Sequence, residues 1–314
     1  MKAAFIKQTG SFKEIQVGDL PMPKTKADEV LVRVIAVSVN YVDTFVRGGG
    51  FKTKMNFPFV IGRDAVGEVV DTNNGFVKGQ LVWTNSMGYD GRTGTTSEFV
   101  AIPKDRLFIA PKVDPIKLVA SVHSSATAAI ILKDILEINK GKKILIEGGA
   151  GHVGRKLVEL ANLEGLIVST TSNQKDFAKL KQLGSKNCFD YHQPTAEIAD
   201  KFDYIIDTSG KVSLQTNLDK LNLFGQIGLI TAPKENNFNF NVRQMYTQSQ
   251  SIKGFVISHA SLSQIQTSAK LLNQYFAQGK LLDEEILSLP ITQAQHAHEL
   301  LEQHIKAKLV LTVD

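Results

Sequence analysis

The sequence predicts an α/β protein in which a doubly wound parallel sheet is inserted into a β-rich, barrel-like domain. Residues 1 to about 111 contain short β-rich runs separated by turn residues, whereas strands and helices alternate from about residue 119 onward. A last strand, residues 308–313, has no evident partner in the alternating part, so we expect it to join the first region. The sequence therefore predicts two domains, formed by residues 1–120 with 261–314 and by residues 121–260.

The first region has the pattern of an antiparallel β domain. Residues 29–39 (EVLVRVIAVSV) are dense in β-branched side chains, which favour strands. Glycine and asparagine clusters separate the apolar runs and indicate turns. On this pattern, strands are expected at 29–39, 65–70, 80–83 and 96–102, and turns or loops at 48–50, 73–75 and 88–94.

The second region alternates between short apolar runs and segments with apolar residues at helical spacing. Strands are expected at 143–147, 166–171, 187–189, 204–207 and 226–231. Helices are expected at 124–138, 153–163, 176–183, 214–221, 261–278 and 293–302. Strands that are separated by helices favour a parallel sheet with helices on both faces.

Composition and charge argue against several classes of protein. The formal net charge of +5 is small and dispersed, which favours a solvated surface over a nucleic-acid-binding patch. Cys188 is the only cysteine, so neither an intrachain disulfide nor a thiolate metal cluster is possible. The N-terminus lacks the apolar core of a signal peptide, and no stretch approaches the ~20 apolar residues that span a bilayer. We expect a soluble cytoplasmic protein with no nucleic-acid or membrane partner.

The strongest local motif is a glycine-rich turn between an expected strand and an expected helix. Residues 144–154 (ILIEGGAGHVG) contain G-x-G-x-x-G at Gly149, Gly151 and Gly154. The first glycine would allow a tight turn, the second would let a pyrophosphate approach the backbone, and the third would let the helix pack on the strand. With His152 and Val153 at the helix start, they form the predicted phosphate-binding site. A glycine-rich turn without a ligand and a methyltransferase loop are the alternatives.

The end of the next strand bears on which nucleotide binds. An acidic residue there would hold the ribose 2′-OH of NAD, but residues 169–175 (STTSNQK) contain no carboxylate. Thr171 stands where the acid would be, and Ser172 and Lys175 are candidates to bind a 2′-phosphate. The segment therefore favours NADPH as the cofactor, the alternative being an ordinary polar loop with an exposed lysine.

Over essentially its whole length the sequence resembles the medium-chain dehydrogenase/reductase superfamily. Within that superfamily it is most similar to the zinc-independent quinone oxidoreductases, also called zeta-crystallin-like. The resemblance rests on VNYVDT at 39–44, IGRDAVGEVV at 61–70, the glycine loop at 148–154 and the ending KLVLTV at 308–313. It implies a GroES-like β-barrel domain, a Rossmann domain, an active-site cleft between them, and a homodimer.

The resemblance also implies where a catalytic zinc would bind in the alcohol dehydrogenase relatives. The cysteine of their first zinc motif falls on Asn40, and the histidine of their Gly-His-Glu motif falls on Arg63. An amide and a guanidinium make no plausible zinc site, and Arg63 would repel the cation. The structural zinc of those relatives needs four cysteines, which this chain does not have. We therefore expect no zinc.

The resemblance assigns further residues to the cofactor. These are Asn40 near the nicotinamide, Thr127 beside the cofactor, Tyr191 beside the adenosine phosphate, Thr208 after the fourth strand, and Thr231 and Ala232 at the nicotinamide end. Two departures bear on substrate preference: residues 123–125 (HSS) replace a commoner proline-containing segment, and Phe45 replaces a frequent tyrosine. His123 precedes Thr127 and is a candidate to face the cleft, whereas His152 would lean over the cofactor or face solvent.

Without zinc, no Lewis acid polarises the substrate, which favours an acceptor that itself delocalises the arriving charge. We expect hydride transfer from NADPH to a quinone or a similar electron-poor carbonyl acceptor. Asn40 would donate a hydrogen bond to the developing oxyanion, and Tyr41 or water would supply the proton. The alternatives are a turn-capping amide for Asn40 and a packed core ring for Tyr41. Asp43 and Asp64 are expected to orient the backbone or to pair with an arginine, Arg47 or Arg63.

Two other functions stay open. An enone or alkenal double-bond reductase would use the same cofactor and the same residues, differing only in the acceptor. A non-enzymatic NADPH-binding protein with an RNA-binding or structural role is the second alternative. The modest charge and the lack of an aromatic and basic stripe weigh against RNA binding.

Overall fold

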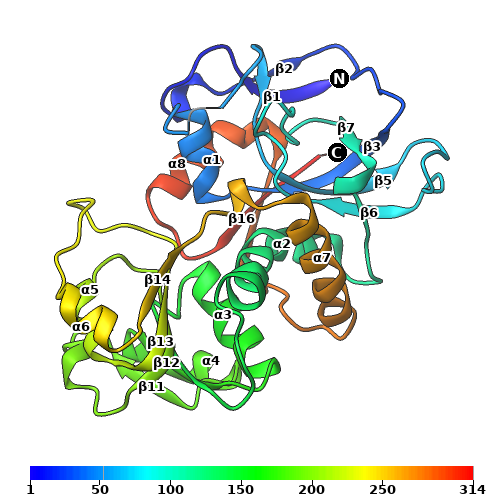
Figure 1. The fold of residues 1–314 in the computed structure, drawn as a ribbon. Helices are drawn as coiled ribbons and strands as arrows, with labels where there is room; N and C mark the ends of the chain where they lie inside the picture. Colours follow the sequence, from blue (N-terminus) through cyan, green and yellow to red (C-terminus); the bar gives the residue numbers. More distant parts are fainter. Residues whose placement is uncertain (52, 314) are drawn as a thin grey trace. The chain divides into compact units, whose positions relative to one another are not determined.

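The computed structural model describes residues 1–51 and 53–313 (Figure 1). It divides into two compact units, one formed by Met1–His123 with Ser261–Asp314 and the other by Ser124–Ala260. We call these unit 1 and unit 2. The division falls within helix α2 (Pro115–Ile130), which begins in unit 1 and ends in unit 2.

Unit 1 is built mainly from β-strands. Among its described residues, one sheet of seven strands has the order β15-β16-β3-β5-β6-β8, with β7 also paired to β3, and a smaller sheet has the order β2-β1-β4. The strands are β1 (Lys2–Ile6), β2 (Gln16–Asp19), β3 (Glu29–Ser38), β4 (Phe59–Val60), β5 (Asp64–Val69), β6 (Leu81–Thr84), β7 (Phe99–Pro103), β8 (Phe108–Ile109), β15 (Ile286–Pro290) and β16 (Lys308–Thr312). The helices are α1 (Tyr41–Arg47), α7 (Leu262–Ala277) and α8 (Ala294–Glu302).

Strand β3 is the centre of this sheet because its β-branched sequence suits a long strand between partners. It pairs antiparallel with β5, with β7 and, at its C-terminal end, with β16. Ser38 lies opposite both Asp64 of β5 and Val310 of β16. The C-terminal strand therefore belongs to the β sheet of unit 1, as Figure 1 shows for the red strand β16.

Unit 2 contains a parallel sheet of six strands in the order β11-β10-β9-β12-β13-β14. The strands are β9 (Lys143–Glu147), β10 (Ile167–Ser172), β11 (Asn187–Asp190), β12 (Phe202–Asp207), β13 (Leu221–Leu229) and β14 (Ser251–Gly254). The helices are α3 (His152–Leu163), α4 (Phe177–Gln182), α5 (Leu214–Asp219) and α6 (Val242–Thr247). In β9 the apolar run from Ile144 to Ile146 is fully buried, as expected for a strand that is covered on both faces. The predicted doubly wound parallel sheet is confirmed.

Several element boundaries differ from the prediction. Helix α2 begins at Pro115, earlier than the expected residue 124, and a π-helical turn (Ile131–Ile135) continues it. Leu221, expected to end a helix, begins β13 instead, where its buried side chain joins the core of unit 2. Helix α1 was not expected, because its seven residues are too few to show a helical period.

One expectation about apolar length was wrong. The helical stretch Pro115–Ile135 is long and apolar enough to cross a membrane by length and composition. Its most apolar window is 83% buried within the protein, so it is a core helix. The sequence pattern missed it because serine, histidine and threonine interrupt the apolar run without exposing it.

Candidate functional site

The glycine-rich turn follows β9 and leads into α3, as predicted. The tight turn falls on Gly148, whose φ is +75°, rather than on Gly149. Gly149 and Gly154 are required by packing, because a Cβ on Gly149 would overlap the Thr170 hydroxyl and one on Gly154 would overlap the Gly148 carbonyl oxygen. Two of the three motif glycines are thus explained by the protein's own contacts.

Gly151 is different, because nothing in the protein requires a glycine there. Its φ of −70° and ψ of 167° suit any residue, and the nearest atom to an added Cβ is the Gly148 carbonyl oxygen at an ordinary 3.5 Å. The residue is exposed and is the N-cap of the 12-residue helix α3. The first turn of such a helix offers N–H groups and a positive dipole end to an anion. The loop therefore fits the pyrophosphate of a dinucleotide.

Threonines from the two neighbouring strands hold this loop. The Gly148 N–H donates to Thr171 Oγ1 at 3.2 Å, and the Gly149 N–H donates to the Thr171 carbonyl at 3.0 Å. From the other side, the Thr208 hydroxyl donates to the Glu147 carbonyl at 2.7 Å and lies 3.2 Å from the Gly148 carbonyl. The structure thus brings Thr171 and Thr208 to the loop, where both stabilise its backbone.

The residues predicted to bind the 2′-phosphate gather at the ends of β10 and β11. The Tyr191 N–H donates to the Ser172 carbonyl at 3.1 Å, and the half-exposed Tyr191 hydroxyl accepts a bond from Asn173 Nδ2 at 3.5 Å. Ser172 itself is buried, and its hydroxyl donates to the Asn173 carbonyl at 3.1 Å. Lys175 is exposed on the following turn.

The sequence prediction missed a carboxylate at this place. Asp190 ends β11 directly opposite Ser172 of β10, and it accepts bonds from the His192 backbone N–H at 2.9 Å and from the His192 ring at 2.6 Å. The His192 backbone N–H holds the pKa of Asp190 below its usual range. The prediction considered only the second strand of the alternating region, whereas this acid belongs to the third.

The remaining predicted cofactor residues lie on other elements of unit 2. Thr127 is nearly buried on α2, and Val153 is half-buried in the first turn of α3. The half-buried His152 ring lies along the helix, with Nδ1 3.3 Å from an Arg155 guanidinium nitrogen. Thr231 and Ala232 are exposed after β13.

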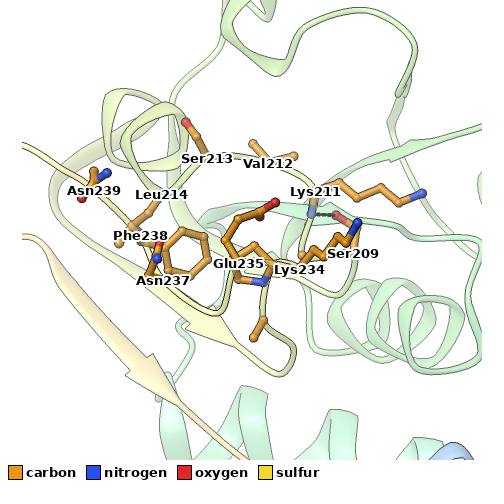
Figure 2. Close-up of a pocket in the computed structure, with 13 residues that line it drawn as sticks. Ser209, Lys211, Val212, Ser213, Leu214, Lys234, Glu235, Asn237, Phe238 and Asn239 are labelled. Atoms are coloured by element: carbon orange, nitrogen blue, oxygen red, sulfur yellow. Dashed lines mark hydrogen bonds between the residues drawn. The ribbon is translucent and has the colours of Figure 1, made fainter.

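A pocket of about 660 Å³ opens where β12 and β13 end (Figure 2). Ser209 and Gly210, which follow Thr208, line it together with Ala232 and Pro233. The structure therefore brings the two predicted after-strand segments to one pocket. Ligands of open α/β sheets bind outside the carboxyl ends of the strands, which is where this pocket lies.

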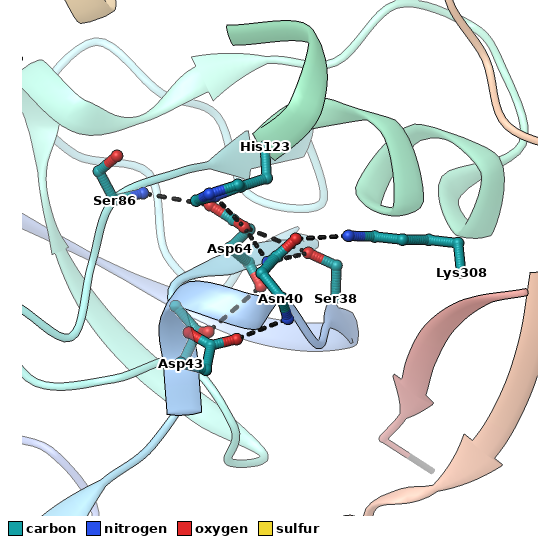
Figure 3. Close-up of polar contacts among 8 residues, drawn as sticks. Ser38, Asn40, Asp43, Asp64, Ser86, His123 and Lys308 are labelled. Carbon is teal, nitrogen blue, oxygen red and sulfur yellow. Dashed lines mark hydrogen bonds and ion pairs between the residues drawn. The ribbon is translucent and has the colours of Figure 1, made fainter. Parts of the chain in front are cut away.

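A buried polar cluster in unit 1 contains Asn40 (Figure 3). Its Nδ2 donates to Asp64 Oδ2 at 2.7 Å and to Ser38 Oγ at 3.0 Å, and its Oδ1 accepts a bond from the Lys308 ammonium. Both amide protons are thus engaged within the protein. The expected donation to a substrate oxyanion does not suit this arrangement, and Asn40 instead links Asp64 to Lys308.

Asp64 is fully buried at the centre of this cluster. Its Oδ2 accepts bonds from Asn40 and from Ser38 at 3.2 Å and lies 3.0 Å from His123 Nδ1, while Oδ1 accepts the Ser86 N–H at 3.2 Å. Burial raises the pKa of Asp64, but His123, Arg63 and Lys308 together hold it below its usual range. The carboxyl group is therefore an anion at neutral pH.

Asp43 lies beside this cluster in the first turn of α1. Its Oδ2 accepts the Asn40 N–H at 2.7 Å, so it orients the backbone as expected. Burial raises the pKa of Asp43 to about 6 against the opposing effects of that hydrogen bond and of Arg63. The Arg63 guanidinium also lies 5.5 Å from the centre of the Tyr89 ring. Arg47 instead binds Glu302 and the Gly10 carbonyl.

Tyr41 is not a packed core ring, because half of it is exposed. The ring stacks on His304 with centroids 5.8 Å apart and meets the Phe45 ring edge-on at 5.6 Å. It follows Asn40 directly in the chain, so an exposed aromatic surface begins at the edge of the buried polar cluster.

The side chains around Asn40 do not suit a metal ion. Among residues 1–51 and 53–313, no three His, Cys, Asp or Glu side chains lie close enough together to hold one. Within the cluster, Asp64 and His123 already pair with each other, and the Lys308 ammonium would oppose a second cation.

Comparisons with known proteins agree with the fold. Residues 26–112 match the model of alcohol dehydrogenase GroES-like domains, and residues 152–274 match that of zinc-binding dehydrogenases. The chain is 27% identical to the quinone oxidoreductase of Sus scrofa, with 90% of this chain and 87% of the relative covered. It is 25% identical to prostaglandin reductase-3 of Mus musculus, with 85% and 74% covered. A solved NAD-dependent alcohol dehydrogenase matches over the full length of both chains with a TM-score of 0.88 at 24% identity. The predicted fold, a Rossmann sheet with a GroES-like β domain, is confirmed.

Proposed function

Because the chain belongs to the medium-chain dehydrogenase/reductase superfamily of oxidoreductases, we propose that it is an NADPH-dependent, zinc-free reductase of quinones or similar electron-poor carbonyl compounds. The observation that carries this proposal is the set of side chains around Asn40. Both of its carboxylates are already engaged, Asp64 by His123 and Asp43 by the Asn40 N–H, and the Lys308 ammonium is bound to Asn40, which makes a poor environment for a zinc ion. With no Lewis acid, the acceptor must itself delocalise the charge that arrives with the hydride, as a quinone does.

The glycine loop supports the cofactor part of the proposal. The open space at Gly151, the first turn of α3 with His152 and Val153, and the packing at Gly149 and Gly154 suit a dinucleotide pyrophosphate. We assign Ser172, Lys175 and Tyr191 to the adenosine phosphate, and Thr127, Thr171, Thr208, Thr231 and Ala232 to other parts of the cofactor. When bound, NADPH supplies the hydride.

Asp190 is a residue near this site that opposes NADPH. It is an anion, but its Oδ1 accepts both bonds from His192, and Lys175 is exposed on the turn that follows β10. Because the carboxylate is satisfied within the protein and the lysine is exposed, the balance favours the 2′-phosphate.

On the substrate side, we propose that Asn40 and Tyr41 have different roles, one in positioning other side chains and the other in contacting the acceptor. Asn40 keeps Asp64 and Lys308 in place through its amide. Tyr41 offers an exposed ring, extended by Phe45, on which a planar acceptor can lie.

We further propose that residues 1–120 with 261–314 form the substrate domain, that residues 121–260 form the dinucleotide-binding domain, and that the protein is a cytoplasmic homodimer.

An enone reductase is the second candidate, because prostaglandin reductase-3 of Mus musculus is nearly as similar as the quinone oxidoreductase. The two functions share the cofactor and differ in the bond that receives the hydride. A quinone gains it within a fully conjugated ring, whereas an enone gains it at the carbon that lies β to the carbonyl.

An acceptor panel separates these functions. Metal-stripped protein with NADPH would be given a para-quinone, an alkyl enone and a saturated aldehyde, with NADPH oxidation followed by absorbance and products by mass spectrometry. We expect oxidation with the quinone and none with the aldehyde. Faster turnover of the enone, with a saturated ketone as product, would assign the second function. Activity that appears only after zinc is added would contradict the proposal.

A further inference from the structure

We infer that His123, held by Asp64, is the group that delivers the proton in the proposed reduction. This inference rests on the proposed function and names a catalytic residue that the sequence motifs do not include. It makes His123 the proton donor in place of Tyr41 or water.

The geometry of the pair fixes how the imidazole works. His123 Nδ1 lies 3.0 Å from Asp64 Oδ2, and the carboxylate is held on its other sides by Asn40, Ser38 and the Ser86 N–H. Because the Asp64 carboxylate faces Nδ1 at this distance, we place a proton on Nδ1 and assign delivery of the proton to the other ring nitrogen, Nε2. Carboxylate–imidazole pairs that orient a proton-transferring nitrogen in this way recur in unrelated enzymes.

A proton donor must be reachable by the substrate, whereas the group that orients it can be fully buried. The exposed fractions of His123 and Asp64 fit these two roles. The Asp64 side chain is 0% exposed, whereas the His123 side chain is 10% exposed, so part of the imidazole reaches an accessible surface. His123 also lies one turn before Thr127 on α2, and residues four apart share a helix face. Thr127 is one of the residues assigned above to the cofactor.

The proposed step balances with one hydride and one proton. With NADPH bound, the acceptor would receive a hydride and its oxygen would take up the negative charge. The N–H bond at His123 Nε2 then breaks as the new O–H bond forms, which leaves NADP⁺, the reduced acceptor and a neutral imidazole. Solvent returns a proton to Nε2 before the next turnover.

Charged side chains of β5, α1 and β16, together with Arg63, lie in the same cluster as this imidazole. Asp64 of β5 contacts it directly, and Asp43 of α1 adds a second negative charge that is felt through space. Arg63, next to Asp64, and Lys308 of β16, bound to Asn40, supply two positive charges.

The variant His123→Asn tests the inference. An asparagine amide can still donate to Asp64 from near the Nδ1 position, but it has no equivalent of Nε2. We expect NADPH affinity to change less than twofold, kcat with a para-quinone to fall about 100-fold at pH 7, and the kcat/KM–pH profile to differ in shape from that of the wild type. His296→Asn, on the exposed face of α8, is the matched control and should keep wild-type kcat and pH profile.

The outcomes separate the two proposals. If the wild-type protein oxidises NADPH with the quinone and H123N keeps its kcat and pH profile, the role of His123 is overturned and the proposed function stands. If the wild-type protein binds NADPH but reduces neither a quinone nor an enone, both are overturned. Nitrogen-15 NMR of histidine-labelled wild-type protein gives a reading that is independent of the variant. Neutral His123 should be protonated at Nδ1, and protonation at Nε2 would refute the inference.

Discussion

Glu147 ends the central strand β9 with its side chain fully buried beside the glycine loop. Its Oε2 accepts a bond from Asn217 Nδ2 at 2.9 Å, and it lies opposite Asp207, the buried last residue of β12. Burial, and then the charge of Asp207, raise the pKa of Glu147 from its usual 4.5 to about 8. At neutral pH the Glu147 carboxyl is therefore mostly protonated.

The stability of the protein should depend on this proton. Between pH 4.5 and about 8 the folded protein holds a proton that the unfolded chain releases, so the free energy of unfolding falls as pH rises through this window. Glu147→Gln has no ionisable group and should lose this dependence. Urea unfolding of both proteins should be measured at pH 5, 7 and 9. As the pH rises, the free energy of unfolding of the variant should increase relative to that of the wild type by on the order of 3 kcal/mol. Parallel pH dependence in the two proteins would refute the buried protonated state.

At the scale of elements, the glycine loop contains glycines that packing requires and one that only a ligand would require. A Cβ on Gly149 would overlap the Thr170 hydroxyl and a Cβ on Gly154 would overlap the Gly148 carbonyl oxygen, so both glycines serve the packing of α3 against the sheet. Gly151 meets only ordinary contacts. A sequence pattern gives all three glycines equal weight, and only the surrounding atoms distinguish them.

This difference predicts opposite effects for two alanine variants. Gly151→Ala should fold with an unchanged Tm, because its Cβ fits and its φ is ordinary, but the methyl group should occupy the space of the pyrophosphate. We expect its Kd for NADPH, measured by nicotinamide fluorescence, to rise at least tenfold, a loss of about 1.4 kcal/mol. Gly149→Ala should lower the free energy of unfolding by about 1–3 kcal/mol through steric overlap. Wild-type NADPH affinity in G151A would refute the assignment of this loop to the pyrophosphate.

The elements also explain why the sequence predicted the glycine loop as a unit, whereas it named Asn40 and His123 as candidates without their contacts to Asp64 and Lys308. The glycine loop is local, because a strand, a turn and a helix follow one another within about twenty residues. The cluster around Asp64 is assembled from β3, β5, α2 and β16, and Lys308 is 268 positions from Asn40. Ser38 lies opposite Val310 in an antiparallel pair, so the residue two positions after Ser38 meets the residue two positions before Val310. No spacing in the sequence reveals that register.

At the scale of the whole molecule, the order of the elements was predictable and their ends were less so. The change from β-rich runs to alternating strands and helices gave the fold class, and the unpartnered last strand indicated an insertion. The chain passes between its two units within helix α2, where no turn residue marks the change. Likewise, β3 accepts partners along both sides, a property of tertiary packing that β propensity does not encode.

The proposed function requires that this fold bind NADPH without zinc and pass its hydride to an electron-poor acceptor. The most direct test is to titrate metal-stripped protein with NADPH and with NADH, following nicotinamide fluorescence, and then to add a para-quinone to the NADPH sample. We expect tighter binding of NADPH than of NADH, unchanged by a chelator, and oxidation of the bound cofactor when the quinone is added. Preferential binding of NADH would contradict the roles given to Ser172 and Lys175, and binding without oxidation by a quinone or an enone would contradict the catalytic claim.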